Sequence, residues 1–233
     1  ITPYGFTLKL SAGWTVHWSS QIARAAVSLL RRLCTFTWAT LSLTILPSIS
    51  AKRCSPVYKC IKYFGKIDIL VNNAGGGHQI DAATGEIDEW FRIADLNLNS
   101  VYRCCRAFGQ HMIDNGYGRI INIASMYGLV GSRGTKNSPY AAAKGGVVNL
   151  TRALGAEWAR YGVNVNAVSP GYFKTEATGG MWELVNNIAT ENTPIKRGGR
   201  EGEITAPVCF LASDEASYVV GITIPCDGGY TCI

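Results

Sequence analysis

From about residue 60 onward, short apolar runs of strand length alternate with longer stretches of helical periodicity. The apolar runs span residues 66–72, 119–124, 163–169 and 221–226. Continuous apolar runs of this length are typical of parallel strands that are buried on both faces. The stretches between them predict helices over residues 87–115, 138–161 and 201–212. This alternation predicts right-handed β-α-β crossovers and therefore an α/β fold with a doubly wound parallel sheet.

The chain length fits one domain, because 233 residues with 47% hydrophobic content can bury a full core. Charge is distributed unevenly along it. Residues 1–67 carry nine Lys or Arg and no acidic residue, whereas residues 68–233 carry thirteen Lys or Arg and sixteen Asp or Glu. The basic excess is therefore confined to the N-terminal third, and we predict no nucleic-acid partner for the chain.

The N-terminal third contains an apolar stretch at residues 33–46, which follows Arg31 and Arg32. It imitates a secretory signal but is too short for a comfortable membrane span, and the Arg-rich, acid-poor composition fits a transit peptide equally well. We predict a cytoplasmic location without membrane association, with organellar delivery or membrane retention through residues 1–55 as the alternative. The chain begins at Ile1 and its first methionine is Met112, so we expect a fragment or a partial reading frame.

Metal binding is not predicted. The eight cysteines form no C-x-x-C pair and have no histidine at ligand spacing, so neither a zinc site nor a compact disulfide framework is indicated.

Three residues carry a recognisable chemistry. Tyr140 and Lys144 are four residues apart on a predicted helix, so the phenol and the ammonium share one face. A nearby cation stabilises a phenolate, and lowering a phenol pKa by roughly 3 units takes about 4 kcal/mol. Ser125 follows a predicted strand and lies at the carboxyl edge of the sheet, where open α/β folds bind ligands. The pattern predicts a proton-transferring Tyr140 beside a Ser125 hydroxyl that contacts a substrate oxygen.

Further segments occur around these residues in a fixed order: Asn72-Asn73-Ala74-Gly75, Asn97, Ser125, Tyr140-x-x-x-Lys144 and Pro170-Gly171. Together they resemble the short-chain dehydrogenase/reductase family, of the classical type. The resemblance implies NAD(P)-dependent interconversion of a secondary alcohol and a ketone. It also implies that Tyr140 is the general acid/base, Lys144 lowers its pKa and holds the nicotinamide ribose, Ser125 orients the substrate oxygen, and Asn97 completes a proton relay.

The resemblance also implies a set of residues that bind the cofactor, with NAD and NADP both open. These residues are Asn73, Ala74, Gly75, Tyr140, Lys144, Pro170, Gly171, Phe173 and Thr175. It further implies a small-molecule alcohol or carbonyl substrate, and a homo-oligomer formed through helices at about residues 87–115 and 138–161. The stretch 169–176 and the Asp-Gly-Gly-Tyr-Thr near the C-terminus are similar to members acting on sugar acids and polyols, with 3-oxoacyl carrier-protein reductases next.

One part of the family pattern is missing. No Thr-Gly-x-x-x-Gly-x-Gly occurs, although that turn lets a pyrophosphate approach a helix N-terminus, and the first Asp is Asp68. The resemblance therefore covers about residues 56–233, and we predict a single Rossmann-like domain whose N-terminal β-α-β half, residues 1–55, is incomplete or aberrant. A misread frame upstream of residue 56 would explain the missing glycines and acidic residues. The alternative to an oxidoreductase is a non-catalytic scaffold that cannot bind a dinucleotide.

Overall fold

The computed structural model describes residues 61–62, 64–77, 79–132, 134–175, 178–200 and 202–232, together with three N-terminal strand segments. Those segments are β1 (Thr7–Leu10), β2 (Trp14–His17) and β3 (Leu33–Phe36). Strands β1 and β2 pair antiparallel in a sheet of their own.

The central sheet has five parallel strands in the order β3-β4-β5-β6-β7. After β3, its strands are β4 (Ile69–Asn72), β5 (Gly118–Ile123), β6 (Val163–Pro170) and β7 (Thr223–Cys226). All residues of β4 and β5 are buried, which explains why these strands appear in the sequence as continuous apolar runs. Because the strands are parallel, their carboxyl ends all lie at one edge of the sheet.

The helices that connect these strands are long between β4 and β6 and shorter afterwards. They are α3 (Ile87–Ala94), α4 (Ser100–Asp114), α5 (Ser138–Trp158), α6 (Trp182–Asn192) and α7 (Thr205–Ala212). A π-helical turn, Asp95–Asn99, joins α3 to α4. Among the described residues, no helix is long and apolar enough to cross a membrane.

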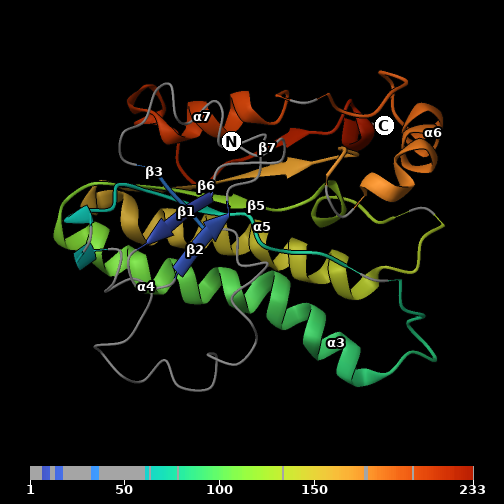
Figure 1. Cartoon of the computed structure of the whole chain (residues 1–233), viewed down its shortest axis with the longest axis horizontal. Coiled ribbons are helices and arrows are strands. Elements are labelled where there is room, and N and C mark those ends of the chain that lie inside the picture. The colour runs from blue at the N-terminus through green and yellow to red at the C-terminus, as the bar shows by residue number, and fades with distance from the viewer. Residues whose placement is uncertain are drawn as a thin grey trace.

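Two hydrophobic cores lie on opposite faces of the sheet. Leu70 and Ile120, which are paired across β4 and β5, point into the core that α4 and α5 cover. Their neighbours Ile69 and Ile121 point the other way, into the core that includes Leu211 of α7. Figure 1 shows this arrangement, with α4 and α5 on one face of the sheet and α7 on the other. The result is a three-layer α/β structure with the sheet in the middle.

A buried chain of polar side chains ties the sheet to α5. Asn72 donates to the side-chain oxygen of Asn122 at 2.8 Å, and Asn122 donates to Thr151 Oγ1 at 3.0 Å. Thr151 in turn donates to the carbonyl of Val147 at 2.8 Å. Because buried polar groups are costly when unpaired, these bonds hold β4, β5 and α5 in register immediately below the carboxyl edge.

The predicted doubly wound α/β fold is confirmed, and the four predicted strands are present as β4 to β7 with shifted ends. The helix expected over 87–115 contains the π turn, which periodicity did not indicate, and the helix expected from residue 201 begins at Thr205. The apolar stretch 33–46 begins with strand β3, which pairs with β4. Most of residues 1–55 lies outside the described residues, so the predicted boundary at residue 56 and the aberrant half stay predictions.

Candidate active site

The sequence-predicted site residues gather at the carboxyl edge of the sheet because each follows the end of a parallel strand or lies on a helix behind it. Asn73 directly follows β4, Ser125 lies two residues beyond β5, and Gly171 directly follows β6. Tyr140 and Lys144 lie in the first two turns of α5, which packs closely against the turn Met126–Gly128 that follows Ser125. At Gly128 a Cβ would come within 2.7 Å of the Lys144 backbone, so glycine permits this approach.

Lys144 is a buried cation, with 3% of its surface exposed. Its Nζ donates to the carbonyl of Ile123 at 2.8 Å, and burial lowers its pKa to about 8. The same Nζ lies 5.7 Å from the centroid of the Tyr140 ring. The shared helix face that the sequence predicted is therefore present, with the lysine directed at the end of β5.

The surroundings of Tyr140 shift its pKa upward. Burial raises the pKa of this phenol, a hydrogen bond with Ser125 opposes the shift, and the neighbouring Tyr127 adds to it. Lys144 does not contribute to this shift, because its ammonium bonds the Ile123 carbonyl. The lowering of the Tyr140 pKa by Lys144 stays a prediction.

Asn97 is fully buried in the π turn, and its amide group is fully engaged. Its Oδ1 accepts from the Gly76 amide at 3.0 Å, and its Nδ2 donates to the carbonyls of Gly76 at 2.7 Å and Ile93 at 2.9 Å. The side chain therefore fixes the loop after β4 against the π turn. Asn97 is adjacent to the site as predicted, and its observed bonds are those of a positioning residue.

Two glycines after β4 pack closely against the site residues. A Cβ on Gly75 would lie 2.7 Å from Asn97 Oδ1 and 3.0 Å from Lys144 Nζ. A Cβ on Gly77 would lie 3.0 Å from the Tyr140 ring. Asn97, Tyr140 and Lys144 therefore all pack against the glycine segment that follows β4.

The segment after β6 begins at the same carboxyl edge of the sheet. Gly171 packs so tightly on Asp227 that a Cβ would approach its Cα to 2.7 Å, and the Gly171 amide donates to the Cys226 carbonyl at 2.9 Å. The Phe173 ring covers Gly199, with which it forms an isolated parallel bridge. Thr175 bonds to Thr178 within the same loop.

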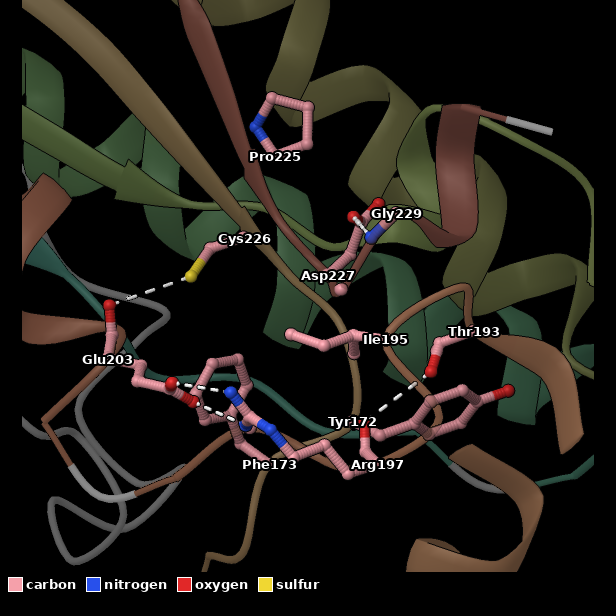
Figure 2. Close-up of a pocket in the computed structure, with 12 residues that line it drawn as sticks. Tyr172, Phe173, Thr193, Ile195, Arg197, Glu203, Pro225, Cys226, Asp227 and Gly229 are labelled. Carbon is pink, nitrogen blue, oxygen red and sulfur yellow. Dashed lines mark hydrogen bonds and ion pairs between the residues drawn. The ribbon is translucent and has the colours of Figure 1, made fainter. Parts of the chain in front are cut away.

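A cavity of about 300 Å³ opens at the ends of β6 and β7. Tyr172, Phe173 and Cys226 line it, together with an ion pair in which Arg197 donates two hydrogen bonds to the Glu203 carboxylate, both at 2.8 Å (Figure 2). Ser125, Tyr140 and Lys144 are not among its lining residues. The predicted cofactor residues are thus divided: Phe173 lines this cavity, while Gly75, Tyr140 and Lys144 lie outside its lining.

Sequence reasoning missed a group of tyrosines at the same edge. Tyr127, Tyr172 and Tyr230 each occur shortly after the end of β5, β6 or β7. The hydroxyls of Tyr127 and Tyr172 are 3.0 Å apart, and both rings contact Tyr230 edge to face. An aromatic residue after three consecutive strand ends was the signal that could have found them.

The fold and site define the class of protein. A parallel sheet of Rossmann type with a Ser, a Tyr and a Lys gathered at its carboxyl edge is an α/β domain built to bind a ligand at that edge.

Comparisons with known proteins agree. The profile of the family described as Enoyl-(Acyl carrier protein) reductase matches residues 54–231. Galactitol 2-dehydrogenase (L-tagatose-forming) from Cereibacter sphaeroides is 44% identical over 167 residues, which are 71% of this chain and 66% of that protein. A 3-oxoacyl-(acyl-carrier-protein) reductase from Haemophilus influenzae is 41% identical over 166 residues, covering 71% of this chain and 68% of the relative.

Among solved structures, a gluconate 5-dehydrogenase from Burkholderia cenocepacia in complex with NADP and tartrate superimposes with a TM-score of 0.72 at 37% identity. The match covers 76% of this chain and 69% of that one. The chain belongs to the short-chain dehydrogenase/reductase family, of the classical type. It spans about two thirds of the length of the relatives it matches.

Proposed function

We propose that this chain is an NAD(P)-dependent oxidoreductase that interconverts a secondary alcohol and a ketone. The observation that carries the proposal is the convergence of Ser125, Tyr140, Lys144 and Asn97 at the carboxyl edge of the sheet, although they come from three separate parts of the chain: the turn after β5, helix α5 and the π turn. Relatives named as dehydrogenases and reductases support the same class of reaction.

The residues present fit the nicotinamide end of a dinucleotide. A Cβ on Gly75 would come within 2.7 Å of Asn97 Oδ1 and 3.0 Å of Lys144 Nζ, so the glycine keeps this edge free of a side chain. The residues that would hold the cofactor are Asn73, Ala74, Gly75, Tyr140, Lys144, Pro170, Gly171, Phe173 and Thr175. The nicotinamide, when bound, exchanges a hydride with the substrate carbon. Which of NAD and NADP is used stays open.

Tyr140 moves the proton in this proposal. Its raised pKa keeps the phenol protonated at neutral pH, so in the reducing direction it donates its proton to the carbonyl oxygen. Ser125, which is hydrogen-bonded to Tyr140, orients that oxygen. Lys144, with a pKa of about 8, is mostly protonated at pH 7 and stabilises the phenolate that remains.

The test is the variant Tyr140→Phe. We expect it to lower the oxidation of galactitol or gluconate, followed as NADH or NADPH formation, by about 10²- to 10⁴-fold, because a positioned acid/base contributes that much. Tyr218→Phe, which changes a fully exposed tyrosine, should retain full activity. Equal activity of Tyr140→Phe and the parent chain, with unchanged circular dichroism, would refute the assignment.

A second candidate is a non-catalytic family member that has lost dinucleotide binding. The sequence observation that favours it is the missing Gly-rich turn. Equilibrium titration with NADH and NADPH separates the two proposals. Micromolar binding that Lys144→Ala weakens supports the enzyme, and a folded chain that binds neither supports the alternative. Homo-oligomer formation and a cytoplasmic location stay predictions.

A further inference from the structure

Three tyrosines from three neighbouring strand ends form one cluster beside the candidate active site. Tyr127 lies in the turn after β5, Tyr172 two residues after β6, and Tyr230 in the turn after β7. The ring centroids of Tyr127 and Tyr230 are 6.0 Å apart and those of Tyr172 and Tyr230 are 5.8 Å apart, both nearly perpendicular. We call these three residues the tyrosine cluster.

The cluster adjoins the residues proposed to do the chemistry. The amide of Tyr127 donates to Ser125 Oγ at 3.2 Å, so its backbone contacts the predicted substrate-orienting hydroxyl directly. The Tyr127 phenol is also close enough to Tyr140 to raise the pKa of that residue. Tyr127 therefore lies next to both residues that are proposed to contact the substrate oxygen.

The cluster offers neutral hydroxyls. Tyr127 and Tyr172 share one hydrogen bond at 3.0 Å, and Tyr172 is also hydrogen-bonded to Tyr230, so the phenol oxygens keep lone pairs that can accept from a ligand. Burial, followed by the hydrogen bond to Tyr127, raises the pKa of Tyr172, so its phenol stays uncharged. All three side chains are only partly buried. Half-buried phenols present an apolar ring and a polar tip to the same ligand.

These rings and hydroxyls suit a ligand whose carbon chain carries a hydroxyl on each carbon. The C–H groups of such a ligand can pack on the tyrosine rings, and its hydroxyls can hydrogen-bond to the phenols. A 3-oxoacyl thioester offers one carbonyl acceptor and an alkyl chain beside its reacting carbonyl, and no hydroxyl donor for the phenol oxygens, so it would make fewer hydrogen bonds with the phenols. We propose that the tyrosine cluster recognises the hydroxyls next to the reacting carbon of a polyhydroxylated substrate. This inference rests on the oxidoreductase function proposed above and assigns its substrate class.

The experiment compares Tyr127→Phe and Tyr172→Phe with the parent chain on three substrates. These are galactitol, a neutral polyol; gluconate, a sugar acid; and cyclohexanol, which has no hydroxyl besides the reacting one. Each Phe variant should lower kcat/KM on the hydroxylated substrates by about tenfold or more, mainly through KM, since one ligand hydrogen bond is lost. Cyclohexanol turnover should change by less than about twofold. The ratio of kcat/KM on galactitol to kcat/KM on gluconate shows whether a neutral polyol or a sugar acid is the preferred substrate.

Tyr161→Phe is the matched control, because this tyrosine lies after α5, away from the cluster, and should change nothing. A calorimetric titration of galactitol and gluconate in the presence of NADH gives a second readout that needs no turnover. Equal losses on cyclohexanol and on the polyols, or undiminished polyol binding by both Phe variants, would overturn the proposal.

Two results distinguish a failure of the tyrosine-cluster assignment from a failure of the proposed oxidoreductase function. If the chain neither binds nor oxidises any hydroxylated chain, yet reduces acetoacetyl-CoA in a manner that Tyr140→Phe abolishes, the cluster assignment fails and the oxidoreductase function stands. If every substrate gives no turnover while galactitol binding is lost in Tyr172→Phe, the cluster assignment stands and the catalytic proposal fails.

Discussion

Lys144 combines a cation with near-complete burial, and this makes its charge costly. Burial lowers its pKa from the usual 10.5 to about 8, which corresponds to about 3 kcal/mol of penalty for the protonated form. The folded state therefore binds fewer protons than the unfolded state between about pH 8 and pH 10.5. By linkage the penalty is complete below pH 8 and is relieved as the pH rises through this window.

We expect Lys144→Met to raise the free energy of unfolding at pH 7 by about 2 kcal/mol, since the penalty outweighs the lost hydrogen bond to Ile123. The advantage should shrink as the pH rises from 8 to 10. Urea unfolding at several pH values measures it, with Lys62→Met at an exposed site as the control. A difference that stays constant from pH 7 to pH 10 would contradict the assigned pKa.

At the residue scale, the sequence predicted which side chains lie close together better than it predicted the direction of the Tyr140 pKa. Ser125, Tyr140 and Lys144 could be placed together because a strand end and an i, i+4 helix pair define positions locally. The direction of the Tyr140 pKa depends on burial and on where the Lys144 ammonium points, and both are set by distant segments. The catalytic roles of these residues stay proposals.

At the element scale, the loop after β4 is locked onto the π turn between α3 and α4. Asn97 makes two bonds to Gly76, and the neighbouring Gly75 sits where no side chain fits. Hydrophobic periodicity indicated one continuous helix over this region, because a single π turn barely disturbs the pattern of apolar residues. The sequence therefore predicted the helix and missed the turn that buries Asn97.

Gly75 and Gly76 provide a matched pair for testing this contact. Gly75→Ala should lower the free energy of unfolding by about 1–3 kcal/mol, because its Cβ meets an Asn97 amide that hydrogen bonds hold in place. It should also weaken NADH or NADPH binding. Gly76→Ala meets nothing within 4 Å, so it should be neutral or stabilising by about 0.4–1 kcal/mol.

Urea unfolding and cofactor titration of both variants give the answer. Equal stability of Gly75→Ala and Gly76→Ala would show that the loop can shift to accommodate a Cβ at residue 75. The close contact of residue 75 with Asn97 and Lys144 would then not require a glycine.

At the scale of the whole molecule, the sequence predicted a sheet with a hydrophobic core on each face. It did not predict that an N-terminal segment adds strand β3 to that sheet. Strands β4 to β7 are apolar runs with helices between them, a pattern that leaves few topologies open. The adjoining strand β3 comes from residues 33–36, where an apolar run is equally typical of a signal segment or a buried strand. Its pairing with β4 is a long-range contact that local pattern does not define.

The outer face of α3 and α4 carries large apolar side chains in contact with solvent. Ile87 and Phe91, one helical turn apart, are 64% and 61% exposed, and Tyr102 on α4 is 49% exposed. Apolar groups gathered on one surface mark interaction sites, and the sequence predicts self-association through residues 87–115 and 138–161. We therefore expect this face to be buried against a second copy of the chain.

Phe91→Glu tests this expectation, because it puts a charge into the proposed interface while keeping a good helix former. Light scattering coupled to size-exclusion chromatography should show a dimer or larger assembly for the parent chain and a smaller mass for Phe91→Glu. Leu184→Glu on α6 changes a side chain that is also 59% exposed but lies outside these helices, so it should leave the mass unchanged. A monomeric parent chain, or an equal mass for parent and Phe91→Glu, would show that this face is not the site of self-association.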